Sequence, residues 1–68
     1  MRTDKWYQRR LFEYFTENYG EFEETTCWFG DPAPNQWLFD ICELGQRIEL
    51  TCDEKGRIHE QIYKLKGV

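Results

Sequence analysis

Residues 36–65 read QWLFDICELGQRIELTCDEKGRIHEQIYKL, and this stretch has the pattern of two consecutive β-hairpins. Its second turn, DEKG at residues 53–56, is typical of a type I turn closed by a left-handed glycine, as found in three-residue hairpin loops. This turn pairs Asp53 with Arg57. Counting back along both strands predicts the further pairs Cys52–Ile58, Thr51–His59, Leu50–Glu60 and Ile48–Ile62.

The first turn of the stretch contains the other glycine. Gly45 and Gln46 fit a two-residue hairpin loop with glycine in its first position. This loop predicts the pairs Leu44–Arg47, Cys42–Glu49, Ile41–Leu50 and Phe39–Cys52.

The two registers together sort the stretch into two faces, because successive side chains of a strand point to opposite sides of the sheet. The apolar face, which we expect to face the core, contains Trp37, Phe39, Ile41, Ile48, Leu50, Cys52, Ile58 and Ile62. The other face is mixed and mostly polar, and contains Leu38, Asp40, Cys42, Leu44, Arg47, Glu49, Thr51, His59, Gln61, Tyr63 and Leu65. Glu60 is the exception on the apolar face, and an edge strand, from which a glutamate reaches water, accounts for it.

An amphipathic helix is predicted before the sheet, from about Lys5 to Asn18, with Asp4 or Thr3 as its N-cap and Gly20 as its C-terminal cap. Its apolar arc at helical spacing consists of Trp6, Tyr7, Leu11, Phe12, Tyr14, Phe15 and Tyr19. Such an aromatic arc needs a large apolar partner, so we expect it to pack on the apolar face of the sheet.

A further strand is predicted within residues 21–30, EFEETTCWFG, from their β-branched and aromatic content. The sequence does not decide which side chains of this strand face the core. Either Trp28 with Thr26 and Phe22, or Phe29 with Cys27 and Thr25, faces the core. The proline-containing loop at residues 31–35 then leads into the next strand.

The fold class that follows is α+β: one helix on one face of a four-stranded antiparallel meander, in the order α-β-β-β-β, forming a single domain over residues 1–68. Ile58, Ile62 and Leu65 also fit a helical spacing, which would give the alternative order α-β-β-β-α. The strand is favoured because Gly56 and the matching register both require it.

Charge and composition disfavour several classes of protein. The formal net charge is −4, from 13 acidic and 9 basic residues, which disfavours attraction of the whole molecule to nucleic acid or anionic lipid. No apolar run is long enough for a membrane span, and the first ten residues, MRTDKWYQRR, lack the apolar stretch of a signal peptide. The odd number of cysteines, three, indicates reduced thiols rather than a disulfide framework. We therefore expect a cytoplasmic protein.

Three cysteines and one histidine match the ligand set of a structural zinc site: Cys27, Cys42, Cys52 and His59. No two of them have CxxC spacing, and the predicted register puts Cys42 and His59 on one face and Cys52 on the other, so we expect no metal. Cys42 and His59 are also two strands apart, roughly 9–10 Å, which is too far for a nucleophile and its base. Without a phosphate loop or dinucleotide fingerprint, the sequence predicts a non-enzymatic protein with no cofactor and no small-molecule substrate.

A single-layer sheet with a helix on one face leaves its other face open. Here that face carries more apolar side chains than a face that contacts only water needs. We therefore expect it to contact protein, either a second copy or a partner. The residues expected to make this contact are Leu38, Leu44, Arg47, Tyr63 and Leu65.

The alternative hypothesis concerns nucleic acid. A basic cluster on the first turns of the helix, Arg2, Lys5, Arg9 and Arg10, would contact an anion or a nucleic acid, with affinity that falls steeply with salt. A solvated helix face with ion pairs to Glu13 and Glu17 is the simpler interpretation. The opposite charge offers another possibility: the acidic run Glu17, Glu21, Glu23 and Glu24 would mimic phosphates and inhibit a nucleic-acid-binding protein.

Overall fold

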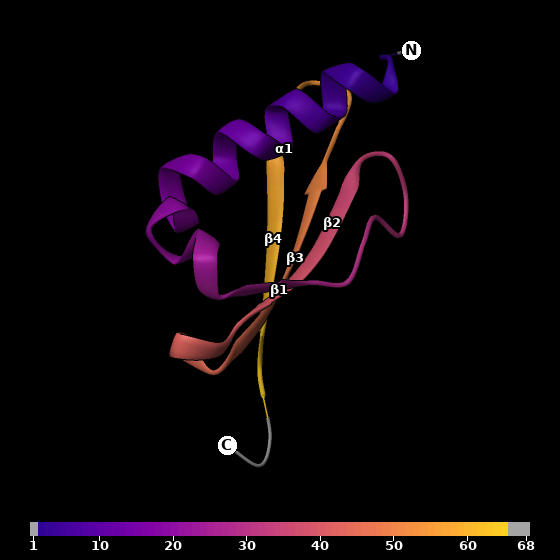
Figure 1. Ribbon diagram of the computed structural model, residues 1–68. Helices are drawn as coiled ribbons and strands as arrows, with labels where there is room; N and C mark the ends of the chain where they lie inside the picture. The colour runs from indigo at the N-terminus through magenta and orange to yellow at the C-terminus, as the bar shows by residue number, and fades with distance from the viewer. Residues whose placement is uncertain (1, 66–68) are drawn as a thin grey trace.

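The computed structural model describes residues 2–65. Along the chain lie helix α1 (Asp4–Tyr19), the 3-10 turn η1 (Gly20–Thr25), strands β1 (Thr26–Trp28) and β2 (Gln36–Ile41), the 3-10 turn η2 (Cys42–Leu44), and strands β3 (Gln46–Cys52) and β4 (Ile58–Lys64). The four strands form one antiparallel sheet in the order β1-β2-β3-β4, and α1 crosses one face of it (Figure 1). The predicted α-β-β-β-β meander is confirmed. The alternative with a C-terminal helix is wrong, because residues 58–64 form a strand.

Helix α1 begins with a side-chain cap. Thr3 has extended dihedral angles, and its Oγ1 accepts a hydrogen bond from the backbone N–H of Trp6 at 3.2 Å. Thr3 is therefore the N-cap, and Asp4 lies in the first turn, where its charge is favourable to the helix dipole. At the other end Gly20 is the C-cap as predicted, but its dihedral angles are right-handed (φ −56°, ψ −33°), so the chain continues as η1.

The strand predicted within residues 21–30 is shorter than expected. Residues 20–25 form η1, and the side-chain hydroxyls of Thr25 and Thr26 donate to the carbonyl of Phe22 at 3.2 and 2.7 Å. Such local side-chain bonds favour turns over extended chain. The open register is also decided. Trp28 is the ladder partner of Phe39 on the helix side of the sheet, so the alternative with Phe29 facing the core is wrong.

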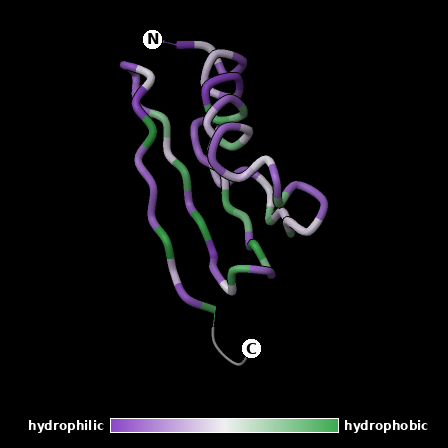
Figure 2. Tube along the Cα trace, turned by 90° about the vertical axis from the view of Figure 1, so that its left-hand side faces the viewer, coloured by the Kyte–Doolittle hydropathy of each residue, from purple (hydrophilic) through white to green (hydrophobic). Residues whose placement is uncertain are grey.

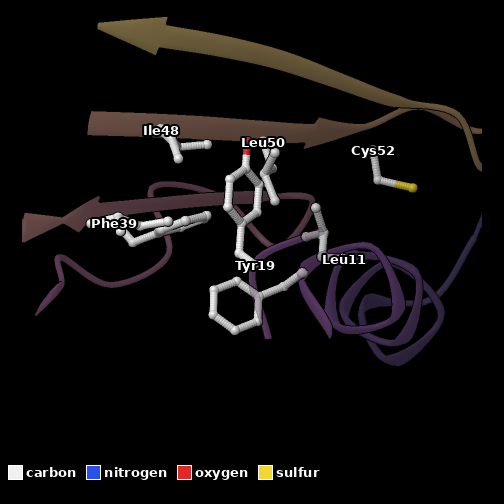
Figure 3. Close-up of a cluster of buried hydrophobic side chains, with 8 residues drawn as sticks. Leu11, Tyr19, Phe39, Ile48, Leu50 and Cys52 are labelled. Carbon is white, nitrogen blue, oxygen red and sulfur yellow. The ribbon is translucent and has the colours of Figure 1, made fainter. Parts of the chain in front are cut away.

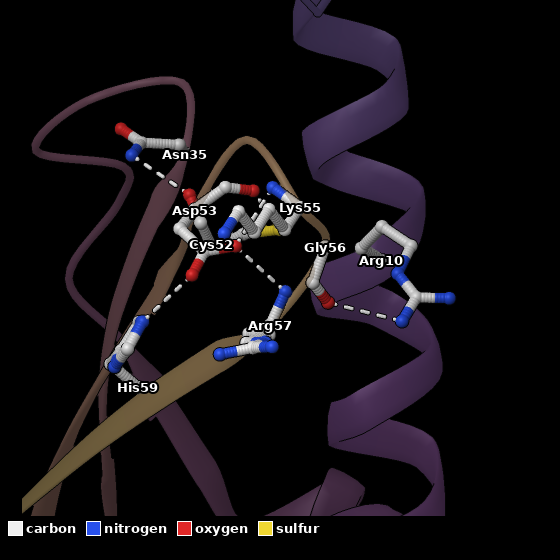
Figure 4. Close-up of polar contacts among 8 residues, drawn as sticks. All are labelled: Arg10, Asn35, Cys52, Asp53, Lys55, Gly56, Arg57 and His59. Atoms are coloured by element: carbon white, nitrogen blue, oxygen red, sulfur yellow. Dashed lines mark hydrogen bonds and ion pairs between the residues drawn. The ribbon is translucent and has the colours of Figure 1, made fainter.

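The DEKG turn has the predicted geometry. Gly56 has φ 84°, and the Asp53 N–H bonds to the Arg57 carbonyl at 3.0 Å. The Asp53 carboxylate also accepts hydrogen bonds from the backbone N–H groups of Lys55 and Arg57, both at 2.9 Å (Figure 4). Every predicted pair between β3 and β4 is confirmed, including Leu50–Glu60 and Ile48–Ile62.

The predicted register between β2 and β3 is wrong by four residues. Residues 42–44 form η2, followed by Gly45 in the left-handed conformation (φ 61°, ψ 38°), so glycine closes a four-residue loop instead of opening a two-residue one. Ile41 therefore pairs with Gln46, not Leu50, and Phe39 pairs with Ile48, not Cys52. The predicted pairs Leu44–Arg47 and Cys42–Glu49 fail for the same reason. Because four is an even number, each strand residue keeps its predicted face.

Alternation along the strands, visible as changing hydropathy in Figure 2, defines two faces. The inner face of the sheet is the one that α1 covers, and the outer face is the one turned away from α1. Between α1 and the inner face lies the core shown in Figure 3, which consists of the buried residues Leu11, Phe15, Tyr19, Phe39, Ile41, Ile48, Leu50 and Cys52. Trp37 and Ile58 are partly buried against it.

Two residues expected in the core are instead exposed. Ile62 is 49% exposed, because β4 is an edge strand that extends beyond α1 (Figure 1). Phe12 is 57% exposed on α1, while Leu11 and Phe15 beside it are buried. The apolar arc of the helix is thus narrower than its sequence predicts.

Glu60, the exception on the inner face, has a partner. The Tyr19 hydroxyl at the edge of the core donates a hydrogen bond to Glu60 Oε2. Burial and this hydrogen bond to a carboxylate both raise the pKa of Tyr19. The glutamate thus satisfies the polar end of a buried tyrosine in addition to reaching water from the edge strand.

Candidate protein-contact site

The outer face is organised by rows of side chains that run across the strands. One row consists of Cys27, Asp40, Arg47 and Tyr63, each the ladder partner of the next. The neighbouring row consists of Leu38, Glu49 and Gln61. Phe29, directly after β1, joins this second row because its N–H bonds to the Leu38 carbonyl at 3.0 Å.

Arg47 is held in a fixed position at the centre of the outer face. Its Nε donates to Asp40 Oδ1 at 2.8 Å, and its Nη2 donates to Oδ2 at 3.3 Å. Its guanidinium carbon also lies 4.7 Å from the ring centroid of Phe29, in cation–π contact. The hydrogen bonds to Asp40 raise the pKa of Arg47. Paired, stacked contacts of this kind fix the plane of the guanidinium as well as its charge.

Apolar side chains surround this arginine. Phe29 is 53% exposed, Tyr63 is 48% exposed and Leu38 is half-buried. We call these three residues, together with Asp40 and Arg47, the Arg47 cluster. Tryptophan, tyrosine and arginine are enriched among the few residues that supply most of the binding energy at protein interfaces. The cluster presents a tyrosine and an arginine side by side on one face.

The structure places the five predicted contact residues in two groups. Leu38, Arg47 and Tyr63 belong to the Arg47 cluster. Leu44 lies in η2, where it is 44% exposed, and Leu65 is half-buried with its N–H bonded to the Gly45 carbonyl at 2.9 Å. These two leucines therefore lie by the β2–β3 turn, at one end of the sheet.

Two members of the cluster, Phe29 and Asp40, are absent from the predicted set. Asp40 becomes the partner of Arg47 only in the observed β2–β3 register, and Phe29 reaches the outer face only in one of the two registers left open for β1. A charge-pairing test of alternative registers would have found Asp40, because only the shifted register sets a carboxylate opposite the arginine.

The basic cluster on α1 is partly occupied with structural contacts. Arg10 donates to the Gly56 carbonyl at 3.0 Å (Figure 4), and one of its nitrogens lies 3.8 Å from Glu13. Arg2 donates to the Glu54 carbonyl at 3.2 Å and lies over the Trp6 ring at 4.4 Å. Both arginines thus hold the β3–β4 turn against α1. Lys5 and Arg9 are exposed, with no ion pair within residues 2–65.

The acidic run lies at the opposite end of the helix. Glu17 is in α1, while Glu21, Glu23 and Glu24 are in η1. All four are exposed, and none of the ion pairs among the described residues involves them.

The four residues weighed as zinc ligands are spread over the molecule. Cys52 is buried in the core, and His59 Nε2 lies 3.0 Å from Asp53 Oδ2, a contact that lowers the pKa of Asp53. Cys27 and Cys42 are exposed, and their Sγ atoms are 3.7 Å apart. In the part of the chain that the structure describes, no group of three or more such side chains is placed to hold a metal ion.

Comparison of the chain with models of protein families, with curated proteins and with solved structures finds no match. Between residues 2 and 65, no helix combines the length and the apolar content that crossing a membrane requires. The candidate site therefore rests on its own geometry and chemistry.

Proposed function

We propose that this chain is a small cytoplasmic, non-enzymatic binding domain that holds a protein partner on the outer face of its sheet. The observation that carries the proposal is the fixed guanidinium of Arg47, paired with Asp40 and stacked on Phe29. A side chain already held in place loses little conformational entropy on binding. Exposed Tyr63 and Phe29 beside it supply the apolar area that a contact surface needs.

The partner that fits this face combines apolar and basic side chains. Asp40 neutralises Arg47, whereas Glu49 in the neighbouring row has no ion pair within residues 2–65. The net charge of −4 adds long-range attraction to a basic partner and repels a second copy of the chain. A different protein is therefore favoured over self-association.

The mass of the purified protein in solution separates these two occupants. Light scattering over a range of concentrations, with and without a chelator, should give the mass of a monomer throughout. A dimer that forms as the concentration rises, and that Tyr63→Ser abolishes, would contradict a heterologous partner and would put a second copy on the outer face.

Photo-cross-linking in cells then tests whether the outer face is the contact. A photoreactive amino acid at position 63 should cross-link the chain to a discrete partner. The matched control is the same amino acid at position 12, because Phe12 is a similarly exposed aromatic residue on α1. Equal cross-linking from both positions, or none from position 63, would contradict the proposal.

A second candidate function is inhibition of a nucleic-acid-binding protein through the acidic run. Four exposed carboxylates without ion pairs among the described residues favour it, because they offer a basic groove the charge pattern of phosphates. In this case Glu21→Gln, Glu23→Gln and Glu24→Gln together would abolish partner binding, while Tyr63→Ser would leave it intact. The proposed outer-face function expects the reverse.

A further inference from the structure

Two exposed thiols are in contact at one margin of the outer face. Cys27 lies in β1 as the ladder partner of Asp40, and Cys42 begins η2, two residues after Asp40. Their Sγ atoms are 3.7 Å apart and form an S–H···S hydrogen bond. Both are free and exposed, so a small reagent in solution can reach either sulfur.

We propose that Cys27 and Cys42 are a redox site, at which a low-molecular-weight disulfide such as oxidised glutathione converts the two thiols into an intramolecular disulfide. The cross-link joins edge strand β1 to turn η2. The inference does not depend on the proposed protein partner.

The reaction proceeds by two thiol–disulfide exchanges. The thiolate of one cysteine attacks a sulfur of oxidised glutathione, forms a mixed disulfide and releases one glutathione thiolate. The second cysteine loses its proton and attacks the first cysteine's sulfur, which releases the other glutathione thiolate. The protein loses two electrons and two protons, and the glutathione disulfide gains them as two thiols.

The geometry makes the second exchange the easy one. A disulfide bond is about 2.05 Å long, so the two sulfurs must approach by roughly 1.7 Å from their present contact. A cysteine without a neighbouring thiol would stop at the mixed disulfide. The contact therefore predicts an internal disulfide rather than a stable glutathione adduct.

Cys52 provides an internal control. It is fully buried in the core, its Sγ lies 3.5 Å from the Asp53 carbonyl, and burial raises the pKa of its thiol. The hydrogen bond to Cys27 also raises the pKa of the Cys42 thiol, so access to the reagent is what separates the sites. Because a reagent in solution does not reach a fully buried sulfur, Cys52 is expected to stay reduced in the folded protein.

The cross-link restrains the part of the sheet that is least anchored. Strand β1 is only three residues long and pairs on one side alone. The bond closes a loop between residues 15 positions apart, which removes conformational freedom from the unfolded chain. We expect oxidation to raise the midpoint of thermal unfolding by roughly 10 °C or more. Phe29, which stacks on Arg47, follows two residues after Cys27 and is restrained with it.

The test is to incubate the folded protein in buffers with increasing ratios of oxidised to reduced glutathione, and to count free thiols after rapid denaturation in a maleimide reagent. Oxidation should leave one reactive thiol of the three, lower the intact mass by about 2 Da and give a peptide map with Cys27 joined to Cys42. Dithiothreitol should restore all three thiols and the lower unfolding temperature.

Cys27→Ser and Cys42→Ser are the informative variants, since both sites are exposed and neither change is expected to disturb the core. Each should stop at a glutathione adduct on the remaining cysteine. Peptide mapping of the unaltered chain identifies the thiol that stays free, so no substitution of buried Cys52 is needed. A glutathione adduct as the final product on the unaltered chain, disulfide-linked dimers, or a pairing that includes Cys52 would overturn the proposal.

Discussion

The two faces of the sheet differ in composition and in burial. Apart from Glu60, the inner face of β2, β3 and β4 is mostly apolar, and five of its residues are fully buried against α1. The outer face has alternating charged, polar and apolar groups, among them the ion pair Asp40–Arg47, which is stacked against Phe29. The inner face therefore supplies the buried core, while the outer face presents an arginine paired with Asp40 beside exposed aromatic rings.

The largest difference between the faces is expected for leucine truncation. Leu50→Ala on the inner face removes a fully buried side chain and should lower the free energy of unfolding by about 2–5 kcal/mol. Leu38→Ala on the outer face is the matched control and should cost much less, because Leu38 is only half-buried. Urea unfolding followed by tryptophan fluorescence measures both. Equal losses would contradict the assignment of the inner face as the core.

The next largest difference in stability is expected between alanine substitutions at two glycines that have positive φ. Gly56→Ala adds a Cβ 3.1 Å from Arg10 Nε and 3.2 Å from the Trp6 ring, where the β3–β4 turn packs on α1. Gly30 has φ 95° with no atom within 4 Å of an added Cβ. Gly30→Ala should therefore cost only the dihedral strain of roughly 1–2 kcal/mol, and Gly56→Ala should cost more.

If the two glycine variants are equally stable in urea, the packing of the turn against α1 adds nothing to the dihedral cost.

A smaller effect is expected at the edge of the inner face, where Tyr19 donates to Glu60. Tyr19→Phe should lower the free energy of unfolding by about 1–2 kcal/mol at neutral pH. The pKa of folded Tyr19 is raised above its unfolded value of 10.0, so its contribution is present below pH 10 and is lost as the pH rises further. The alkaline loss of stability should thus be shallower in Tyr19→Phe, as measured by urea unfolding between pH 8 and 11. An identical alkaline slope in both proteins would contradict this contact.

The smallest effect is expected at Asp53, in the exposed turn. The hydrogen bond to His59, and then those from the Arg57 and Lys55 N–H groups, lower the pKa of folded Asp53 below its unfolded value of 3.8. Its contribution is therefore present above about pH 4 and is lost as the pH falls below that value. The acid loss of stability should be shallower in Asp53→Asn. Unfolding followed by circular dichroism between pH 2 and 6 checks this, and an unchanged acid profile would contradict the role of the carboxylate.

The two hairpin turns show how far local sequence predicts this fold. In DEKG, the Asp53 carboxylate caps the turn with bonds to two nearby N–H groups, so the turn and its register are encoded locally. In CELG, residues 42–45, a glycine suits either the first position of a short turn or the last position of a longer one. The longer loop forms where η2 packs against η1, a tertiary contact that no local pattern contains.

In the candidate site, too, local sequence predicts some residues and not others. The sequence predicts the outer-face position of Arg47, Tyr63 and Leu38, because the face of a strand residue depends only on whether its position along the strand is odd or even. Phe29 is not predictable in this way, and Asp40 is found only when alternative β2–β3 registers are compared, because contacts with Arg47 depend on which residues of neighbouring strands are opposite one another. The contact between Cys27 and Cys42 likewise requires both the β1 register and the fold of η2.

We propose that the partner binds the outer face and not the exposed surface of α1. Affinity for the cross-linked partner, measured by calorimetry for two matched phenylalanine variants, tests it most directly. Phe29→Ser removes the ring under Arg47 and should weaken binding by about tenfold or more, whereas Phe12→Ser on α1 should leave the affinity unchanged. An unchanged affinity for Phe29→Ser, with a loss for Phe12→Ser, would contradict the account.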